Sequence, residues 1–332
     1  MIICSKAPLR LGLAGGGSDV SPYSDIYGGN VLNATINLSA YCTIEPLTEP
    51  VIEVRADDAA INTRVPLNGR TGATLIDGVI ARFGPMESGF RIHTWNDAPA
   101  GSGLGTSSTM VVAILKCFLE WLQRPIDTYT LARTAYEIER MDLALAGGKQ
   151  DQYAAAFGGF NFMSFNTDDT VTVAPVVLPE STVDTLQDSM LLYFTGRSRE
   201  GAAIISEQQK ATRSGKTAAV EAMHRIKQSA FDMRDALQAA NFKAFADILG
   251  RAWEDKKKMA EAITNPMIQT AFDTAMAAGA ISGKVSGAGG GGFIMLMVPP
   301  ERKSIIADAL SRLPGEVRDF HFTSEGAVSW KQ

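Results

Sequence analysis

The first third of the chain is dominated by patterns that are typical of β-strands. Residues 31–45 and 51–55 are rich in β-branched side chains with mixed alternation, and residues 90–94 form another short run of this kind. A turn cluster at residues 96–99 follows the last run and leads into a glycine-rich loop. We therefore expect strands over these three ranges and a loop after the third.

From Ser107 the spacing of apolar residues changes to that of a helix. Apolar side chains recur there at steps of three and four residues, at Val111, Leu115, Phe118, Leu119 and Leu122. A second helix is expected to begin near a cap at Asp127 and to run to about residue 145, before a glycine pair ends it.

The second half of the chain is mainly helical. A run of alternating threonine and valine predicts a strand over residues 170–178, and a boundary near residues 180–188 then divides the chain into domains 1–182 and 183–332. Helices are expected over residues 201–212, 218–241 and 242–263, followed by a glycine-rich segment and a strand within residues 284–298.

Composition and charge restrict the class of protein. The 332 residues are 45% hydrophobic and 20% charged, as expected of a two-domain globular enzyme. The formal net charge of −5 argues against a nucleic-acid partner, which requires a basic face. The apolar run at residues 293–298 is too short to span a bilayer, and Lys6 and Arg10 interrupt the apolar N-terminal stretch, so neither a membrane span nor a signal peptide is expected.

The cysteines and histidines are scattered. Cys4, Cys42 and Cys117 show no Cys-x-x-Cys spacing, and the three histidines are equally dispersed. We expect reduced thiols in a cytoplasmic protein and no zinc cluster.

Three segments contain more glycine than folding alone requires: the first segment (residues 7–19), the second segment (99–108) and the third segment (284–292). The second leads directly into a helix that begins with hydroxyl side chains. Free N–H groups at a helix N-terminus bind anions, and hydroxyls there can hold Mg²⁺ beside a phosphate. The alternative is a capped glycine loop without a ligand.

Two familiar phosphate-binding patterns are excluded. The second segment lacks the Gly-Lys-Ser/Thr of a Walker A loop. The third segment matches Gly-x-Gly-x-x-Gly at Gly287, Gly289 and Gly292, but a strand-like run follows it where a dinucleotide site needs a helix.

Together the three segments resemble the three signature motifs of the GHMP kinases, in the same order and along the whole chain. The second segment carries the pattern Pro-x-x-x-Gly-Leu-Gly-(Ser/Thr)-Ser of that family. The resemblance implies an α+β protein with two parts. The N-terminal half would have a ribosomal protein S5 domain 2-like fold, the C-terminal half a ferredoxin-like fold, and the active site would lie between them.

The first segment indicates which group of GHMP kinases the chain resembles. Galactokinases carry Gly-Glu-His where this chain has Gly15-Gly16-Gly17. The glycine run with its following aspartate, and the Gly-Gly-Asn-Val-Leu-Asn-Ala that starts at residue 28, resemble the D-glycero-D-manno-heptose 7-phosphate kinases. Such enzymes phosphorylate the anomeric hydroxyl, giving a 1,7-bisphosphate on the way to a nucleotide-activated heptose.

The resemblance also implies the catalytic groups. Asp151, after the glycine pair at residues 147–148, matches the catalytic aspartate and would orient the anomeric hydroxyl and accept its proton. Arg10 matches the cation that pairs with it, and a cation there favours an orienting role over strong proton abstraction. The alternatives are a helix N-cap for Asp151 and a strand-end surface arginine for Arg10.

The resemblance also implies which residues bind the nucleotide and the metal ion. ATP would be held by the second segment, at Pro99, Gly101, Ser102, Gly103, Leu104, Gly105, Thr106, Ser107 and Ser108. Mg²⁺ would be bound by Ser107 and Glu139, with Glu137 as a nearby competitor. The alternative for Glu139 is a solvated helical charge paired with Arg140 or Arg133.

Substrate residues are expected on the first and third segments, at Gly15, Gly16, Gly17, Asp19, Gly287, Ala288 and Gly289. The alternative for Asp19 is an Asx-turn. A 7-phosphate needs a further cation, and the candidates are Arg197, Arg199 and the lysines at residues 256–258, of which Arg199 fits the resemblance to the heptose kinases best. The lysines at residues 256–258 lie among acidic residues and are interpreted as a solvated helical face.

Two rival functions stay open at this point. One is a kinase of an unphosphorylated sugar such as fucose or galactose. The other is a catalytically inactive regulator that binds ATP and sugar, which the retention of Asp151, Arg10, Ser107 and Glu139 disfavours. The sequence does not give the oligomeric state.

Overall fold

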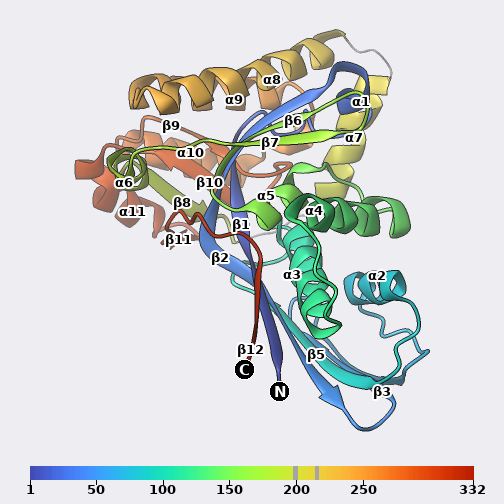
Figure 1. The fold of residues 1–332 in the computed structure, drawn as a ribbon. Helices are drawn as coiled ribbons and strands as arrows, with labels where there is room; N and C mark the ends of the chain where they lie inside the picture. Colours follow the sequence, from blue (N-terminus) through green and yellow to red (C-terminus); the bar gives the residue numbers. More distant parts are fainter. Residues whose placement is uncertain (197–200, 214–216) are drawn as a thin grey trace.

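The fold is organised by two β-sheets, seen in a computed structural model that describes residues 1–196, 201–213 and 217–332 (Figure 1). The larger sheet has eight strands, six of which follow the order β12-β1-β2-β5-β3-β4. The other two form a branch, in which β6 pairs with β2 and β7 pairs with β6. Its strands are β1 (Ile3–Ala14), β2 (Gly29–Leu47), β3 (Val51–Ala56), β4 (Ile61–Pro66), β5 (Gly89–Asn96), β6 (Phe160–Phe165), β7 (Val171–Pro175) and β12 (Val328–Lys331).

Helices of the N-terminal half cover one side of this sheet. The helix α3 runs from Thr106 to Trp121, packs against β1 and β2, and is buried along most of its length because it is apolar on nearly every face. Around it lie α2 (Thr74–Phe83), α4 (Thr128–Glu137), a π-helix (Ile138–Asp142) and α5 (Gln150–Phe157). The short α1 (Tyr23–Tyr27) lies apart from α3, with Tyr23 hydrogen-bonded to His224 of the C-terminal half.

The smaller sheet forms the C-terminal half. Its antiparallel order is β11-β8-β10-β9, and the chain passes through it as strand, helices, two strands, helix and strand, which is the ferredoxin-like arrangement. The strands are β8 (Met190–Phe194), β9 (Ser282–Val285), β10 (Phe293–Met297) and β11 (Glu316–Arg318). The helices are α6 (Glu180–Asp188), α7 (Gly201–Arg213), α8 (Thr217–Gln238), α9 (Phe242–Lys257), α10 (Pro266–Ala277) and α11 (Lys303–Leu310), with short 3₁₀ turns at Glu261–Ile263 and Pro300–Arg302.

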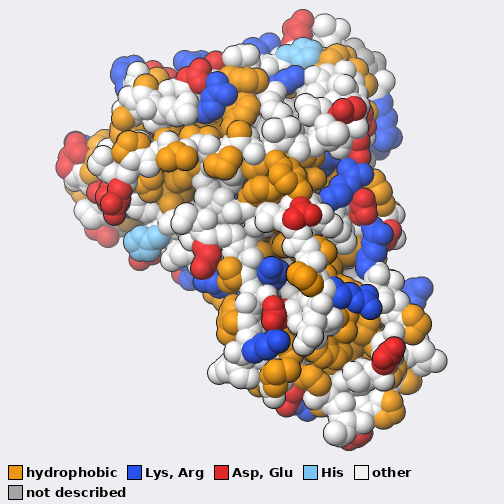
Figure 2. Space-filling model, in the orientation of Figure 1, with side chains coloured by type: hydrophobic (Ala, Val, Ile, Leu, Met, Phe, Trp, Pro, Cys, Tyr) orange, Lys and Arg blue, Asp and Glu red, His pale blue; other side chains and the backbone are white. Residues whose placement is uncertain are grey.

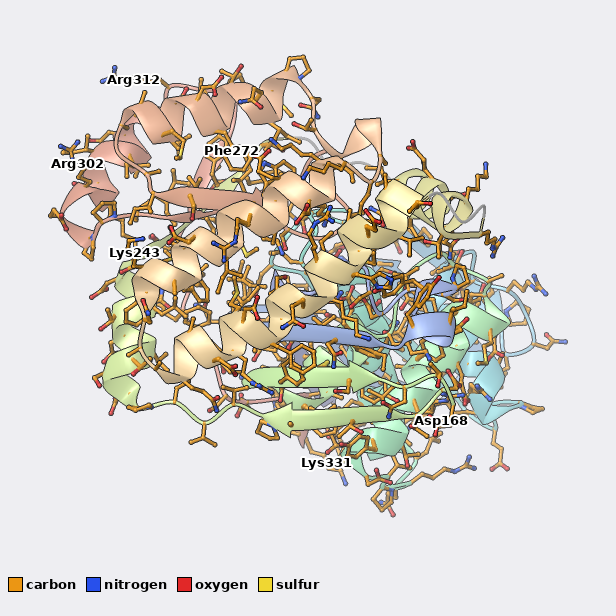
Figure 3. All side chains as sticks on the ribbon, turned by 90° about the horizontal axis from the view of Figure 1, so that it is seen from above. Asp168, Lys243, Phe272, Arg302, Arg312 and Lys331 are labelled. Atoms are coloured by element: carbon orange, nitrogen blue, oxygen red, sulfur yellow. The ribbon has the colours of Figure 1, made fainter. Side chains whose placement is uncertain are left out.

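The two halves share a hydrophobic core. Leucines of β1 and β2 pack in one cluster with side chains of α8, α9, β8 and β10. Seen from above, α8 and α9 lie side by side across the strands, while Arg302 and Arg312 point outward on the side away from the N-terminal half (Figure 3). This shared core fixes the position of the first glycine segment relative to the third.

Most of the predicted elements are confirmed. The expected strands correspond to β2, β3, β5, β7 and β10, and the expected helices to α3, α4, α7, α8 and α9. Two predicted helix ends are wrong. The helix expected to reach residue 145 changes to π geometry after Glu137, and the one expected to reach residue 263 ends at Lys257.

The predicted division at residues 182 and 183 falls within α6, between β7 of the larger sheet and β8 of the smaller one. The strand β12 pairs with β1, so residues 328–331 lie in the sheet of the N-terminal half. Figure 1 accordingly shows both chain ends side by side at the lower edge of the molecule. The domain boundary itself stays a prediction.

On the face shown in Figure 2, basic and acidic side chains are interspersed rather than gathered by sign. Within the described residues, no helix combines the length and the apolar character needed to cross a membrane.

Candidate active site

The three glycine segments meet around one cavity of about 330 Å³ between the two halves. The second and third segments touch backbone to backbone. A Cβ on Gly103 would lie 2.5 Å from the carbonyl oxygen of Ser286, and a Cβ on Gly287 would lie 2.7 Å from Cα of Gly103. Both glycines also have positive φ, +83° and +68°, so a side chain is excluded at each by conformation as well as by space.

Asp151 and Arg10 form an ion pair at the wall of this cavity. Nε of Arg10 donates to Oδ1 of Asp151 at 2.7 Å, and the arginine side chain is only 5% exposed. The same guanidinium donates through Nη1 to the carbonyl oxygen of Gly103 at 2.5 Å. Arg10 therefore ties the candidate catalytic carboxylate to the second glycine segment, and neither the surface alternative nor the N-cap alternative describes these residues.

The N-terminus of α3 opens into the cavity. Gly105 precedes the helix in the left-handed conformation and has no side chain with which to cap it. A Cβ on Gly105 would lie 3.1 Å from the carboxyl carbon of Asp151, so the helix start and the aspartate are close neighbours. The arrangement presents backbone N–H groups of the first helical turn to an anion beside Asp151.

Glu139 is buried, with 1% of its surface exposed, and sits in the π-helix after α4. Its Oε1 accepts from Oγ of Ser107 at 2.7 Å and its Oε2 accepts from Nε2 of Gln152 at 2.6 Å. The description as a solvated charge is therefore wrong for Glu139, but the ion pair with Arg140 named in that alternative is present, with Nη1 of Arg140 3.3 Å from Oε1 of Glu139. Glu137 fits that description instead, since it pairs at the surface with Arg82 and Arg133.

Asp19 is held by four donors. Its Oδ1 accepts from N of Gly17 and Nε2 of Gln150, and its Oδ2 accepts from N of Lys149 and N of Gln150, at 3.0–3.1 Å. Burial raises the pKa of Asp19, and the charge of Asp151 adds to the effect. These bonds fill the carboxylate's acceptor positions, so a sugar hydroxyl could bond to Asp19 only by displacing one of them. In this structure Asp19 holds the start of α5, the helix that carries Asp151.

Two lysines that were not among the favoured site residues also line the cavity. Lys256 is 7% exposed and Lys284 is 6% exposed. The interpretation of residues 256–258 as a solvated face is therefore wrong for Lys256, although Lys257 and Lys258 do pair with Glu254 and Asp255 on the outer side of α9. The sequence signal was present in the helical period, because Lys256 continues the buried face formed by Leu249, Ala252 and Trp253.

The other expected site residues divide into two groups. Those that line the cavity are Gly16, Gly17, Gly101, Gly103, Gly105, Thr106, Ser107, Ser108, Gly287, Ala288 and Gly289. Gly15, Pro99, Ser102 and Leu104 are instead part of the framework around it. The carbonyl of Ser102 accepts from N of Phe293 at 2.9 Å and that of Leu104 from N of Arg10 at 3.2 Å. Arg199 lies outside the described residues.

Family models match both halves of the chain. Residues 73–159 match the GHMP kinases N terminal domain, and residues 233–315 match the GHMP kinases C terminal domain. The first range contains the second glycine segment with Glu139 and Asp151, and the second contains Lys256 and the third segment.

Similar proteins cover the whole chain. A D-glycero-alpha-D-manno-heptose 7-phosphate kinase of Campylobacter jejuni is 42% identical, and the alignment covers 99% of each protein. The solved structure of a D-glycero-D-manno-heptose 1-phosphate kinase from Bacteroides thetaiotaomicron is 51% identical, covers 99% of each chain and has a TM-score of 0.85. A Lactococcus lactis galactokinase solved with galactose shares the fold at 16% identity, with a TM-score of 0.78 over 98% of this chain and 95% of its own.

Proposed function

The chain belongs to the GHMP kinases, and from this premise we propose that it transfers the γ-phosphoryl group of ATP to the anomeric hydroxyl of D-glycero-D-manno-heptose 7-phosphate. The product would be the 1,7-bisphosphate, an intermediate for nucleotide-activated heptose. The observation that carries the proposal is the Arg10–Asp151 pair beside the open N-terminus of α3, at one wall of the cavity. The free, buried cysteines are compatible with the cytoplasmic location that we propose for it.

Each part of the transfer has a group in the chain to support it. The N–H groups at the start of α3 hold the phosphates of the nucleotide. Asp151 orients the anomeric hydroxyl and accepts its proton as the new O–P bond forms and the bond from the γ-phosphorus to the bridging oxygen breaks. Arg10 keeps the carboxylate in place, because it bonds to Asp151 and Gly103 at once.

Ser107 and Glu139 fit a Mg²⁺ ion, which kinases of this family are expected to use with ATP. They supply two neighbouring oxygen ligands, and Mg²⁺ commonly takes one or two protein ligands and fills its other positions with water and phosphate. This is also compatible with the absence, within the described residues, of any larger cluster of metal-binding side chains. A bound ion would neutralise charge on the transferring phosphates.

Glu139→Gln should raise the Mg²⁺ concentration for half-maximal activity at least about tenfold. The substitution removes one oxygen ligand and turns an amide nitrogen toward donors of Ser107 or Gln152, so a stability loss of about 1–3 kcal/mol is also expected. Activity is measured across a magnesium titration below the melting temperature of each variant. The control is Glu137→Gln, and an unchanged magnesium profile in Glu139→Gln would remove Glu139 from the metal site.

The position of the phosphate on the acceptor needs a direct test, because the two heptose kinases among the relatives are named for different phosphates. We expect heptose 7-phosphate to be used about 10- to 100-fold better, in kcat/KM, than the unphosphorylated heptose, since one buried charge-assisted contact has that effect. Two-dimensional ¹H–³¹P NMR of the product should show the new phosphate on the anomeric carbon. Equal use of both heptoses, or better use of fucose or galactose, would favour the plain-sugar kinase.

A further inference from the structure

Two buried ammonium groups of the C-terminal half lie at the cavity without an assigned role in the transfer. Lys284, on β9, donates through Nζ to the carbonyl oxygens of Gly12 at 2.8 Å and Leu13 at 3.3 Å. Lys256, in the last turn of α9, donates through Nζ to the carbonyl oxygen of Gly287. The lysines therefore bind the backbone of the first and third glycine segments and line the same cavity as Asp151.

Neither lysine forms an ion pair with a residue that the structure describes, although the charge of the buried Asp19 raises the pKa of Lys256. The contrast with the same helix is sharp, because Lys257 pairs with Glu254 at 2.7 Å and Lys258 with Asp255 at 3.0 Å. Burial of a cation that lacks a counter-ion is unfavourable, and it lowers the pKa of a lysine. Burial lowers the pKa of Lys256 to about 8, and that of Lys284 well below its ordinary value.

The two ammonium groups also act on each other. The charge of Lys256 lowers the pKa of Lys284 further, and the charge of Arg10 lowers the pKa of both. Three cations thus converge on one side of the cavity, and only Arg10 forms an ion pair with a carboxylate, while the charge of Asp19 offsets part of the lowered pKa of Lys256. Such a cluster is stabilised when an anion enters, and an anion with a double negative charge would match both lysines.

We propose that Lys256 and Lys284 bind the phosphate that the acceptor sugar already carries, and so select a sugar phosphate over a plain sugar. The inference rests on the proposed function. Each ammonium has three N–H donors, so the carbonyl bonds leave two on Lys256 and one on Lys284. A phosphate monoester has three oxygens to accept them and a charge of about −1.5 to −2 near neutral pH.

The lysines lie on the side of the cavity formed by the first and third segments, because their bonds go to Gly12, Leu13 and Gly287. The groups assigned to ATP and Mg²⁺ are the second segment, the first turn of α3 and Glu139, and the two sides meet where Gly287 touches Gly103. The cavity between them is continuous and contains the Asp151 carboxylate. A sugar whose anomeric hydroxyl lies at Asp151 would then have its own phosphate at the lysines.

The test compares Lys256→Met and Lys284→Met with the matched control Lys258→Met, which lies on the exposed side of α9. Each of the first two variants should lower kcat/KM for heptose 7-phosphate about 10- to 100-fold. Because both lysines also anchor glycine segments that line the site, some loss with the unphosphorylated heptose is expected as well, and the readout is the ratio of the two kcat/KM values. That ratio should fall about 10- to 100-fold in each of the two variants and stay within about twofold of the wild-type ratio in Lys258→Met.

A second readout requires no substitution. When heptose 7-phosphate binds, its negative charge should raise the pKa of Lys256 from about 8, so the protein should take up a proton at pH 9. Calorimetry in two buffers of different ionisation enthalpy measures this uptake. It should be smaller in Lys256→Met, and the affinity of the wild type for heptose 7-phosphate should fall as the pH rises above 8.

The outcomes separate this inference from the proposed function. If the wild-type enzyme does not prefer heptose 7-phosphate to heptose, the proposed substrate is wrong. If it does prefer the phosphate, but the two methionine variants lose activity equally on both acceptors or mainly weaken ATP, the lysines serve the transfer or the nucleotide and the inference is wrong. Binding by the wild type without proton uptake at pH 9 would also overturn it.

Discussion

Asp151→Asn is expected to lower kcat by about 10²–10⁴-fold, because it removes both the proton acceptor and the negative charge that orients the anomeric hydroxyl. The fold should be retained, since the amide oxygen of asparagine can still accept from Nε of Arg10. ATP affinity should stay close to that of the wild type, because the nucleotide contacts that we assign lie on the second glycine segment and the start of α3.

Steady-state kinetics paired with ATP binding by calorimetry would check this expectation. Turnover by Asp151→Asn at nearly the wild-type rate would show that another group orients the hydroxyl. A parallel loss of ATP binding would show that the aspartate belongs to the nucleotide site.

Arg10→Met should destabilise the protein by about 3–5 kcal/mol, because it leaves a partly buried carboxylate without its cation. It also removes the bond to the carbonyl of Gly103, so the second glycine segment loses an anchor. Activity should fall with stability, and Arg10→Lys should recover little of it. An ammonium cannot reproduce the fork with which the guanidinium reaches Asp151 and Gly103 together.

A double-mutant cycle separates these effects. Arg10→Met combined with Asp151→Asn should be more stable than Arg10→Met alone by at least about 1 kcal/mol, because the neutral amide needs no counter-ion. Urea unfolding of the four proteins gives the coupling energy. Additive free energies of unfolding would mean that the 2.7 Å contact contributes nothing as an ion pair.

The sequence was most informative where a local pattern determines structure. The apolar period from residue 107 predicted α3, and the Asp127 cap is confirmed by its bond to N of Thr130. The resemblance to the GHMP kinases pointed to Arg10 in the first glycine segment and to Asp151 after the glycine pair at residues 147–148, and the structure brings these two candidate catalytic residues together. The approach of the second and third segments to one another through Gly103 and Gly287 could be expected only once the family was recognised.

Local sequence patterns could not predict contacts between residues that lie far apart in the chain. Nothing local indicates that Asp19 binds the start of α5, some 130 residues later, or that Lys284 reaches back to the carbonyl of Gly12. The short helices α2 and α5 were missed for a related reason. Their burial is supplied by packing against neighbouring elements, and a short amphipathic run has too little pattern of its own.

The pairing of β12 with β1 affects how the protein folds during its synthesis. Cys4 and Gln332 are in contact although 328 residues separate them, and residues 2 and 332 exchange two backbone hydrogen bonds. On the ribosome, β1 can pair with β2 early, but its other edge stays open until nearly the whole described chain has been synthesised. An open strand edge is a template for association with other chains. This edge is therefore where a nascent molecule would be most in need of a chaperone, and where a tag fused close to residue 332 would interfere most with the final step of folding.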